Sequence, residues 1–535
     1  MDIGIQVHIQ IIRVKFRLSE IINKINNEIF WIRNKNDIYE NALNLLPVKD
    51  ANYSANLNWS NLEFIRLDNA GILIEPASGS WIGISPSCAS LEEAKSIINE
   101  SFEKSPELKS FLFRRNIVTD ETGAVFYPPT IETPEGRNLP LHYLFVVETT
   151  ERCNLRCVYC FKSASTKALD MTEEMAYKVA DYISAFGDNP ISVDFSGGEP
   201  TLNLKIIEII ASELSKRTSY IDFSIQTNAT LISNELIELV KRYKIHLSSS
   251  LEGSIEDLKT LRPFANGKDA GKQILNGISK LSKERLISGV VSSYNSNIVN
   301  NYRAFYDMIE QIGISTVKLN LCSPLGRWET HKEEMEAELI KYTEYVKQFV
   351  AEGMKRPTPI KESITNSIAD KILNRIPQYR CINSPCDAGY TFQNIRPNGD
   401  IYPCDRYSRF SELKLGNINS ILADEEYIEL RNNNKVLDFV SSLVLNNKTT
   451  YMLNKRTVHS INTCSKCNLR SYCGSGCGME SYCVHNSFDK PSAECKFFKE
   501  HIPQVFEWLI NSSRFRDIYY PNNSERFSYS FSYCR

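Results

Sequence analysis

A regular alternation of strand-like and helix-like segments runs from about residue 140 to residue 330. Strand-like stretches such as LHYLFVVE and ISVDF are rich in β-branched and aromatic residues, and amphipathic stretches such as LKIIEIIASELSKR and SNELIELVKRY stand between them. Six such repeats occur. Because parallel strands need a crossover between them, the pattern predicts an α/β fold in which all strands end at one edge of a sheet. We expect functional side chains at that edge.

The composition indicates a multidomain protein without a charge excess. The 535 residues exceed what one core normally supports, and 42% hydrophobic content is ample for folding. A net charge of -2, from 62 basic and 64 acidic residues, gives no general field that attracts nucleic acid or anionic membranes. No apolar run approaches the roughly 20 residues of a spanning helix, and the first residues do not form a signal-peptide core. We therefore expect a cytoplasmic protein that binds neither nucleic acid nor membrane.

Fifteen cysteines in such a compartment favour metal or redox chemistry over disulfides. Three of them, Cys153, Cys157 and Cys160, stand in CxxxCxxC spacing directly after LHYLFVVE. Three thiolates on one short loop can hold three irons of a four-iron cubane and leave the fourth iron without a protein ligand. A structural zinc site closes instead with four protein ligands. The loop alone is compatible with an open cluster or with half of a zinc site.

Glycines and polar residues follow the next strands. The segment ISVDFSGGEPTLN predicts a strand, a glycine turn and then a helix. Glycines let the backbone approach a ligand, and the amides and carbonyls of such a turn can hold the ammonium of an amino acid. Polar residues that end the two following strands are equally compatible with capping of those strands. The candidate ligand-binding residues at these strand ends are Gly197, Gly198, Glu199, Pro200, Gln226, Asn228 and Ser250.

The CxxxCxxC spacing, with Tyr159 before its last cysteine and GGEP one strand later, resembles the radical S-adenosylmethionine (radical SAM) superfamily. The resemblance implies a (β/α)6 partial barrel, with a [4Fe-4S] cluster on the three cysteines and SAM chelated to the open iron. It implies that GGEP holds the methionine end of SAM and that Ser250 contacts the ribose, beside Gln226 and Asn228. The family's SLDG reads SLEG here, so that Glu252 replaces the usual aspartate and lengthens the carboxylate arm.

A second field of nine cysteines spans residues 381–495. By spacing alone it is compatible with zinc ribbons or with auxiliary iron-sulfur clusters. Beside the radical SAM motifs it resembles the SPASM domain, including the GxxxxC element from Gly399 to Cys404. That resemblance implies two auxiliary [4Fe-4S] clusters, with Cys483 competing with Cys495 for the last position. The implied ligand sets are Cys381, Cys386, Cys404 and Cys477 for one cluster, and Cys464, Cys467, Cys473 and Cys495 for the other.

Several single residues receive their own interpretation. Asp405 follows Cys404, where related anaerobic sulfatase maturases use an aspartate as a base; ordering of the cluster loop is the alternative. Arg262 and Gly326 lie in loops on the ligand side and are interpreted as a solvated charge and an ordinary turn residue. The cysteines without partners at motif spacing, interpreted as buried or incidental thiols, are Cys88, Cys322 and Cys534.

The barrel is predicted at 141–330, a helical bridge at 331–380, the SPASM domain at 381–500, and a C-terminal helix and tail at 501–535. Ahead of it we expect a helical extension at 1–60, a candidate winged-helix peptide-recognition module at 61–120 and a Pro- and Gly-rich linker at 121–140. Strands followed by short helices can capture an extended peptide along a strand edge, whereas a helical cap over the barrel mouth is the alternative.

The long segment before the barrel favours a radical SAM/SPASM maturase that forms a thioether or carbon crosslink in a ribosomally made precursor peptide. The resemblance implies reductive cleavage of SAM to a 5′-deoxyadenosyl radical, and a reducing partner such as a flavodoxin or ferredoxin. A formylglycine-generating enzyme like the anaerobic sulfatase maturases is the alternative. A zinc-stabilised binding protein on a degenerate barrel is a third hypothesis, disfavoured because both motifs are intact.

Overall fold

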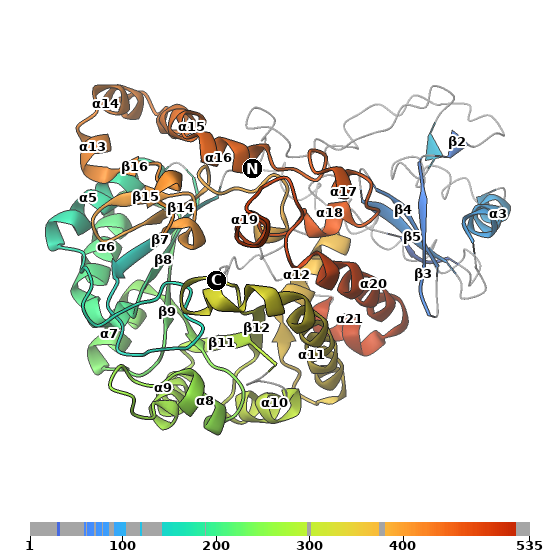
Figure 1. The fold of residues 1–535 in the computed structure, drawn as a ribbon, viewed down its shortest axis with the longest axis horizontal. Helices are drawn as coiled ribbons and strands as arrows, with labels where there is room; N and C mark the ends of the chain where they lie inside the picture. The colour runs from blue at the N-terminus through green and yellow to red at the C-terminus, as the bar shows by residue number, and fades with distance from the viewer. Residues whose placement is uncertain are drawn as a thin grey trace, which may run out of the picture.

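The computed structural model describes residues 142–520 apart from gaps at 188, 297–300 and 374–379, together with N-terminal segments at 29–32, 58–59, 61–68, 71–76, 79–84, 90–102 and 118–119. Its largest element is a ten-stranded sheet in the order β13-β12-β11-β10-β9-β8-β7-β14-β15-β16 (Figure 1). Among the described residues, no helix has both the length and the apolar character that crossing a bilayer requires.

Six parallel strands in sequence order form the centre of this sheet. They are β7 (Tyr143–Thr150), β8 (Ile191–Gly197), β9 (Ile221–Thr227), β10 (His246–Ser250), β11 (Ile287–Tyr294) and β12 (Thr316–Leu321). The predicted alternation and the predicted parallel sheet are confirmed. Since all six strands run the same way, the polar residues that follow β8, β9 and β10 meet at one edge.

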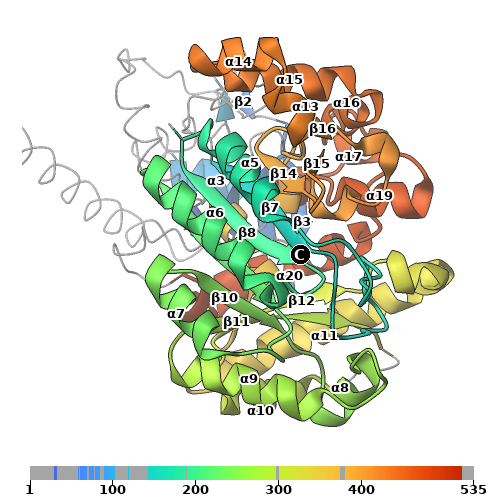
Figure 2. The same ribbon diagram turned by 90° about the vertical axis from the view of Figure 1, so that its left-hand side faces the viewer.

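Helices lie along the outside of these strands (Figure 2). They are α5 (Glu173–Ser184), α6 (Leu204–Arg217), α7 (Asn234–Tyr243), α8 (Ile255–Leu261), α9 (Gly271–Lys283) and α10 (Tyr302–Gln311). In α6, Ile207, Ile210 and Leu214 recur at helical spacing and are all fully buried. The side chain of Thr172 caps α5 by accepting a hydrogen bond from the Met175 amide. Each crossover therefore buries an apolar stripe against the sheet.

The second cysteine field is joined to the same sheet. Strand β14 (Phe392–Ile395) pairs in parallel with β7, and β15 (Asp400–Tyr402) and β16 (Gly416–Asn417) continue it in antiparallel fashion, while β13 (Lys361–Glu362) closes the other side. The remaining helical elements are η2 (Pro200–Asn203), η3 (Gly326–Glu334), α11 (Met335–Lys355), α12 (Ser363–Ile372), η4 (Arg380–Ile382), η5 (Asp405–Tyr407), η6 (Ser411–Leu413), α13 (Ile418–Leu422), α14 (Glu425–Asn432), α15 (Val436–Asn446), α16 (Lys448–Lys455), α17 (Asn462–Ser465), α18 (Arg470–Cys473), α19 (Gly478–His485), α20 (Cys495–Asn511) and α21 (Ser513–Tyr519).

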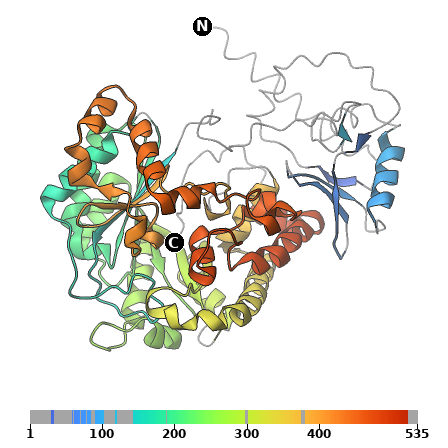
Figure 3. The ribbon, with the colours of Figure 1, turned by 45° about the horizontal axis from the view of Figure 1, so that its top comes forward.

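An antiparallel sheet of N-terminal strands lies beside α18 and α20 (Figure 3). Its order is β1 (Ile29–Ile32), β5 (Ser80–Ile84), β4 (Gly71–Glu75) and β3 (Glu63–Arg66), with α3 (Leu91–Phe102) following. The buried Trp81 on β5 donates its indole N–H to the Ile372 carbonyl at 2.9 Å and packs edge-on against Phe506, with 5.0 Å between the ring centroids. These contacts fix the hairpin of β4 and β5 against the C-terminal helices.

The strands expected after residue 60 are observed as β3, β4 and β5, and the first of the short helices expected after them is observed as α3, whereas the second lies outside the described residues. The helical extension predicted over 1–60 is wrong at two places, because the chain forms strands there: β1, which pairs with β5, and β2 (Asn58–Trp59), which pairs with β6 (Val118–Thr119). The IFWI sequence of β1 is β-branched and aromatic, and pairing with β5 decides its conformation. The rest of 1–60, the linker at 121–140 and the tail after residue 520 lie outside the described residues. Winged-helix identity stays a prediction.

Candidate active site

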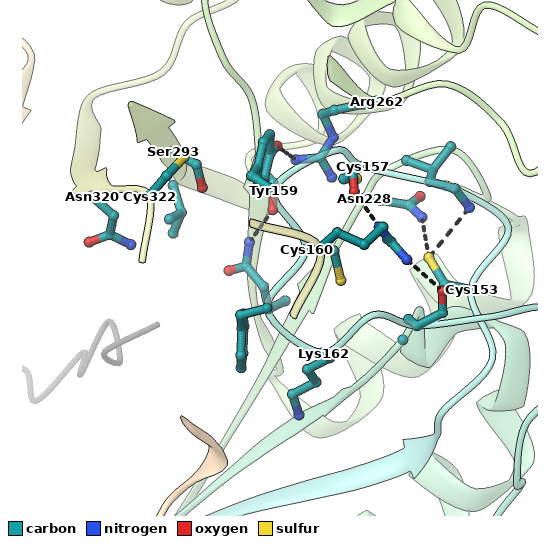
Figure 4. Close-up of a pocket in the computed structure, with 18 of the residues that line it drawn as sticks. Cys153, Cys157, Tyr159, Cys160, Lys162, Asn228, Arg262, Ser293, Asn320 and Cys322 are labelled. Atoms are coloured by element: carbon teal, nitrogen blue, oxygen red, sulfur yellow. Dashed lines mark hydrogen bonds between the residues drawn. The ribbon is translucent and has the colours of Figure 1, made fainter. Parts of the chain in front are cut away.

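A cavity of about 170 Å³ opens at the carboxyl edge of the parallel strands. Figure 4 shows Cys153, Cys157 and Cys160 on one side of it and Asn320 and Cys322 on the opposite side. The predicted cofactor residues that line it are Tyr159, Gly197, Gly198, Glu199, Gln226, Asn228 and Ser250. Pro200 is buried at the start of η2. The fold thus brings the predicted residues together, whereas their individual roles stay predictions.

The three-cysteine loop is fixed from across the barrel by the GR dipeptide before α11. Gly326 has a φ of +60°, and a Cβ atom there would lie 2.4 Å from the carbonyl oxygen of Cys160. The neighbouring Arg327 donates its backbone N–H to the Cys160 carbonyl at 3.1 Å and its Nε to the Cys157 carbonyl at 2.7 Å. Gly326 thus has the turn conformation expected of it, and in addition only glycine permits this close approach to the cysteine loop.

The chemistry of the sulfur atoms fits thiolate ligands. Cys153 Sγ accepts a hydrogen bond from the Leu155 amide at 3.4 Å and a longer one from Asn228 Nδ2 at 3.9 Å. Burial raises the pKa of Cys153 to about 12 and that of Cys157 to about 11, and the Arg262 guanidinium opposes the shift at Cys157. Buried thiolates need a cation or a metal to become stable. Three thiols on one loop, of which Cys153 has N–H donors, match the donor set of an open four-iron cluster.

Arg262 is a wall residue of this cavity, although the sequence suggested a solvated charge. Its side chain is only 5% exposed, and Nη1 donates to Tyr159 Oη at 3.0 Å and to both oxygens of the fully buried Glu252 at 3.3 Å. Glu252 also accepts from the Ser293 amide at 3.4 Å. Arg262 is the C-cap of α8, after the last helical residue, so the helical periodicity of the sequence did not indicate its burial.

Glu199 of the GGEP turn ties the ends of β8 and β9 together. Its carboxylate, 1% exposed, accepts hydrogen bonds from Thr201 Oγ1 at 2.6 Å, Thr227 Oγ1 at 2.7 Å and the Asn228 amide at 2.7 Å. Burial raises the pKa of Glu199, and these donors oppose the shift. These hydrogen bonds hold the Glu199 side chain in place at the GGEP turn.

The two glycines of the GGEP turn are required by the neighbouring chain. A Cβ atom would lie 1.9 Å from the Thr150 oxygen at Gly197 and 2.2 Å from the Arg152 oxygen at Gly198. The Gly198 amide also donates to the Thr150 carbonyl at 2.8 Å. We expected the glycines to admit a ligand, and the structure shows that they first admit the chain that leads into the cysteine loop.

Gln226 and Ser250 extend the cavity wall along β9 and β10. Gln226 Nε2 donates to Ser250 Oγ at 3.1 Å, and Ser248 Oγ donates to Gln226 Oε1. Asn228 Nδ2 donates to Asn154 Oδ1 at 2.8 Å, which links the end of β9 to the cysteine loop. Cys322, interpreted from its spacing as a buried or incidental thiol, is buried and lies in the opposite wall.

A second cavity contains Cys381, Cys386, Cys404 and Cys477, which we call the first auxiliary group. Hydrogen bonding from Cys381 lowers the pKa of Cys477, and backbone N–H groups of Ala388, Arg406 and Glu480 donate to the sulfur atoms of Cys386, Cys404 and Cys477. The group thus has the donor surroundings that thiolate ligands require. Asp405 is buried in this cavity, so that it lies beside the cysteines.

The remaining predicted ligands, Cys464, Cys467, Cys473 and Cys495, form the second auxiliary group. Burial raises the pKa of Cys464, Cys473 and Cys495; thiolate charge on Cys495 adds to the shift at Cys464 and Cys473, and charge on Cys467 adds to the shift at Cys495. Burial likewise raises the pKa of Cys483, with smaller contributions from the charges of Glu480 and of Cys477 in the first auxiliary group. These influences favour Cys495 over Cys483 as a member of the second set, and the assignment stays a prediction. Among the described residues no three Cys, His, Asp or Glu side chains surround a point that one metal ion could occupy. Cys88 and Cys534 lie outside those residues.

Comparison with known families agrees with this arrangement. Residues 147–312 match the radical SAM superfamily, and residues 386–468 match SPASM, an iron-sulfur cluster-binding domain. Residues 147–312 therefore belong to the radical SAM superfamily, and residues 386–468 form a SPASM domain. Membership explains why one sheet carries both the three-cysteine loop and the second cysteine field, and it disfavours the hypothesis of a zinc-stabilised binding protein.

Related proteins differ in how much of their length the chain covers. It is 31% identical over 182 residues to the uncharacterized protein MJ0907 of Methanocaldococcus jannaschii, which is 34% of this chain and 62% of that protein. It is 26% identical over 296 residues to the antilisterial bacteriocin subtilosin biosynthesis protein AlbA of Bacillus subtilis, over 54% and 60% of the two chains. The chain thus spans less than two thirds of both relatives.

Coverage is fuller for the cysteine-type anaerobic sulfatase-maturating enzyme of Clostridium perfringens. The identity is 23% over 388 residues, which is 70% of this chain and 98% of that enzyme. The solved structure of native anSMEcpe with bound AdoMet and Kp18Cys peptide gives a TM-score of 0.56 at 19% identity, over 69% of this chain and 98% of that one. At this identity the likeness establishes a shared fold.

Proposed function

We propose that this radical SAM/SPASM protein is a maturase that modifies a ribosomally made precursor peptide by forming a thioether or carbon crosslink. The observation that carries the proposal is the cavity in which three thiols of one loop face the ends of β9 to β12. A bound, reduced cluster with SAM supplies a 5′-deoxyadenosyl radical, an oxidant strong enough for an unactivated carbon. The chain's own residues bind, orient and shield the reactants.

In this proposal Cys153, Cys157 and Cys160 hold three irons of the SAM-binding cluster. The buried Arg262 adds a cation to the wall beside Tyr159, where it offsets thiolate charge and suits an anionic group of the ligand. The residues proposed to contact SAM are Tyr159, Gly197, Gly198, Glu199, Pro200, Gln226, Asn228 and Ser250.

The two auxiliary groups are proposed to hold one [4Fe-4S] cluster each, and a flavodoxin or ferredoxin is proposed as the reducing partner. Asp405 is a candidate base, because its carboxylate is 2% exposed and lies with the first auxiliary group in one cavity. Ordering of the loop after Cys404 is the alternative role for this side chain.

A peptide substrate is supported by three observations. AlbA acts in the biosynthesis of a bacteriocin, anSMEcpe has been solved with a bound peptide, and this chain carries an additional sheet of strands ahead of its barrel. The alternative substrate, a sulfatase, is favoured by the 98% coverage of the Clostridium enzyme and by the presence of Asp405.

The experiment that tests the proposal is the mass of a short peptide encoded next to this chain after anaerobic co-expression. We expect loss of a pair of hydrogens with the intact chain and no loss with Cys157→Ala, which removes one cluster ligand. Fragmentation of the product then locates the crosslink. An unchanged peptide mass in both cultures, together with modification of a sulfatase-derived cysteine peptide, would contradict a precursor-peptide maturase and favour the alternative.

A further inference from the structure

Arg406 lies where the two cavities meet. It follows Asp405 in η5, and its side chain, 18% exposed, lines both the cavity of the three-cysteine loop and the cavity of the first auxiliary group. The residue has no place in the motifs that identify the family. Its position nevertheless makes it a point of contact between the two proposed cluster sites.

An ion pair holds the Arg406 guanidinium in this position. Nη1 contacts the carboxylate of Glu480, which is 4% exposed, and donates to Ser323 Oγ at 3.1 Å; Ser323 in turn donates to Glu480. Ser323 follows β12 at the wall of the main cavity, whereas Glu480 belongs to α19. The pair therefore joins the SPASM domain to the mouth of the barrel.

Both partners also touch the cysteines of the first auxiliary group through their backbones. The Arg406 amide donates to Cys404 and the Glu480 amide donates to Cys477. The guanidinium charge acts directly on Cys477, whose pKa it helps to lower after the larger effect of the hydrogen bond from Cys381. A fixed positive and a fixed negative charge thus stand beside the same set of thiolates in a buried setting.

We propose that the Arg406–Glu480 pair sets the reduction potential of the cluster at the first auxiliary group, and so its readiness to accept an electron from the substrate. The inference rests on the proposed function. A cluster that gains one electron gains one negative charge, which a nearby cation stabilises and a nearby carboxylate destabilises.

In the reaction, the 5′-deoxyadenosyl radical takes one hydrogen atom; the substrate radical then gives one electron to the oxidised cluster and one proton to a base as the crosslink forms. The reduced cluster passes its electron to an external acceptor of the flavodoxin or ferredoxin class.

The test is an anaerobic redox titration of the purified, cluster-loaded enzyme, followed by electron paramagnetic resonance. Arg406→Met removes the cation, and we expect the reduction equilibrium of this cluster to fall about tenfold, which is about 59 mV for one electron. Glu480→Gln removes the carboxylate, and we expect a shift of similar size in the opposite direction. Arg406→Lys keeps the charge, so that its potential is expected to stay near that of the wild type.

Shifts of the reduction potential in opposite directions distinguish an electrostatic role from a structural one. Loss of packing would shift the potential of both variants in the same direction or remove iron from both. Arg431→Met is the matched control: its guanidinium pairs with Asp181 at 2.7 and 2.9 Å, and Arg431 is absent from the lining of both cavities. Unchanged potentials in Arg406→Met and Glu480→Gln, or shifts of equal sign, would overturn the inference. If Arg406→Met cannot hold the cluster, Glu480→Gln and Arg406→Lys decide the question. Absence of any cluster at this group in the wild type would instead refute the proposed function.

Discussion

Replacing Gly326 by alanine tests whether the GR dipeptide before α11 positions the three-cysteine loop. The new methyl group would lie 2.4 Å from the carbonyl oxygens of both Cys160 and Phe161, where backbone rather than a flexible side chain must move. An ordinary contact of this kind is about 3.4 Å, so the loop must shift by about 1 Å, and a displacement of that size can cost about 100-fold in rate. Alanine at this positive φ adds about 1 kcal/mol of backbone strain.

Gly267→Ala separates these two effects. Gly267 also has a positive φ, +81°, but no atom lies within 4 Å of the place that a methyl group would take there, so only the backbone cost of about 1 kcal/mol applies. The assay is iron content and SAM cleavage of both variants after identical anaerobic reconstitution. We expect Gly326→Ala to hold less iron at the SAM-binding cluster and to cleave SAM about 100-fold more slowly, whereas Gly267→Ala keeps the iron content and the cleavage rate of the wild type. Equal iron content and equal cleavage in the two variants would refute the reasoning.

Three further predictions concern cluster ligands, the cavity wall and acid stability. Cys495→Ser is expected to lose the iron of one auxiliary cluster while Cys483→Ser keeps it; iron analysis showing the reverse would exchange their assignments. Arg262→Met leaves the buried Glu252 without its cation and is expected to cost about 3 kcal/mol of stability. The double variant Arg262→Met with Glu252→Gln should recover the melting temperature but not the affinity for SAM, measured by equilibrium binding. Recovery of both would contradict a ligand-binding role for Arg262. Burial lowers the pKa of His501 to about 3, so as the pH falls the unfolded chain takes up a proton on this residue before the folded chain does. The free energy of unfolding is therefore highest above the unfolded pKa and decreases by about 2 kcal/mol between about pH 7.5 and pH 5. His501→Phe should reduce this acid-dependent drop in melting temperature, and an equal drop in both proteins would exclude His501 as its source.

The sequence predicted the central sheet because its information is local. The buried stripe of α6 and the alternation of strands and helices follow from spacings of a few residues, and the elements from β7 to β12 were found close to their observed bounds. Parallel strand direction then places Glu199, Gln226 and Ser250 at one edge without further information.

Contacts between distant segments left no such periodic signal. The approach of Gly326 to Cys160 joins residues far apart in the chain, and burial of Arg262 depends on Glu252 from the preceding strand end. Charged residues are mostly exposed, so a paired, buried arginine is the less expected case. Arg406 illustrates the same limit, because its role follows from two cavities that only the folded chain brings together.

The most direct test of the central claim is SAM cleavage by the anaerobically reconstituted protein in the presence of a strong reductant. The account predicts methionine and 5′-deoxyadenosine from the wild type, and neither product from a variant in which Cys153, Cys157 and Cys160 are all alanine but the auxiliary iron remains. Absence of 5′-deoxyadenosine from wild-type protein that carries its full iron and sulfide, or equal amounts from the triple variant, would contradict an open cluster at the three-cysteine loop.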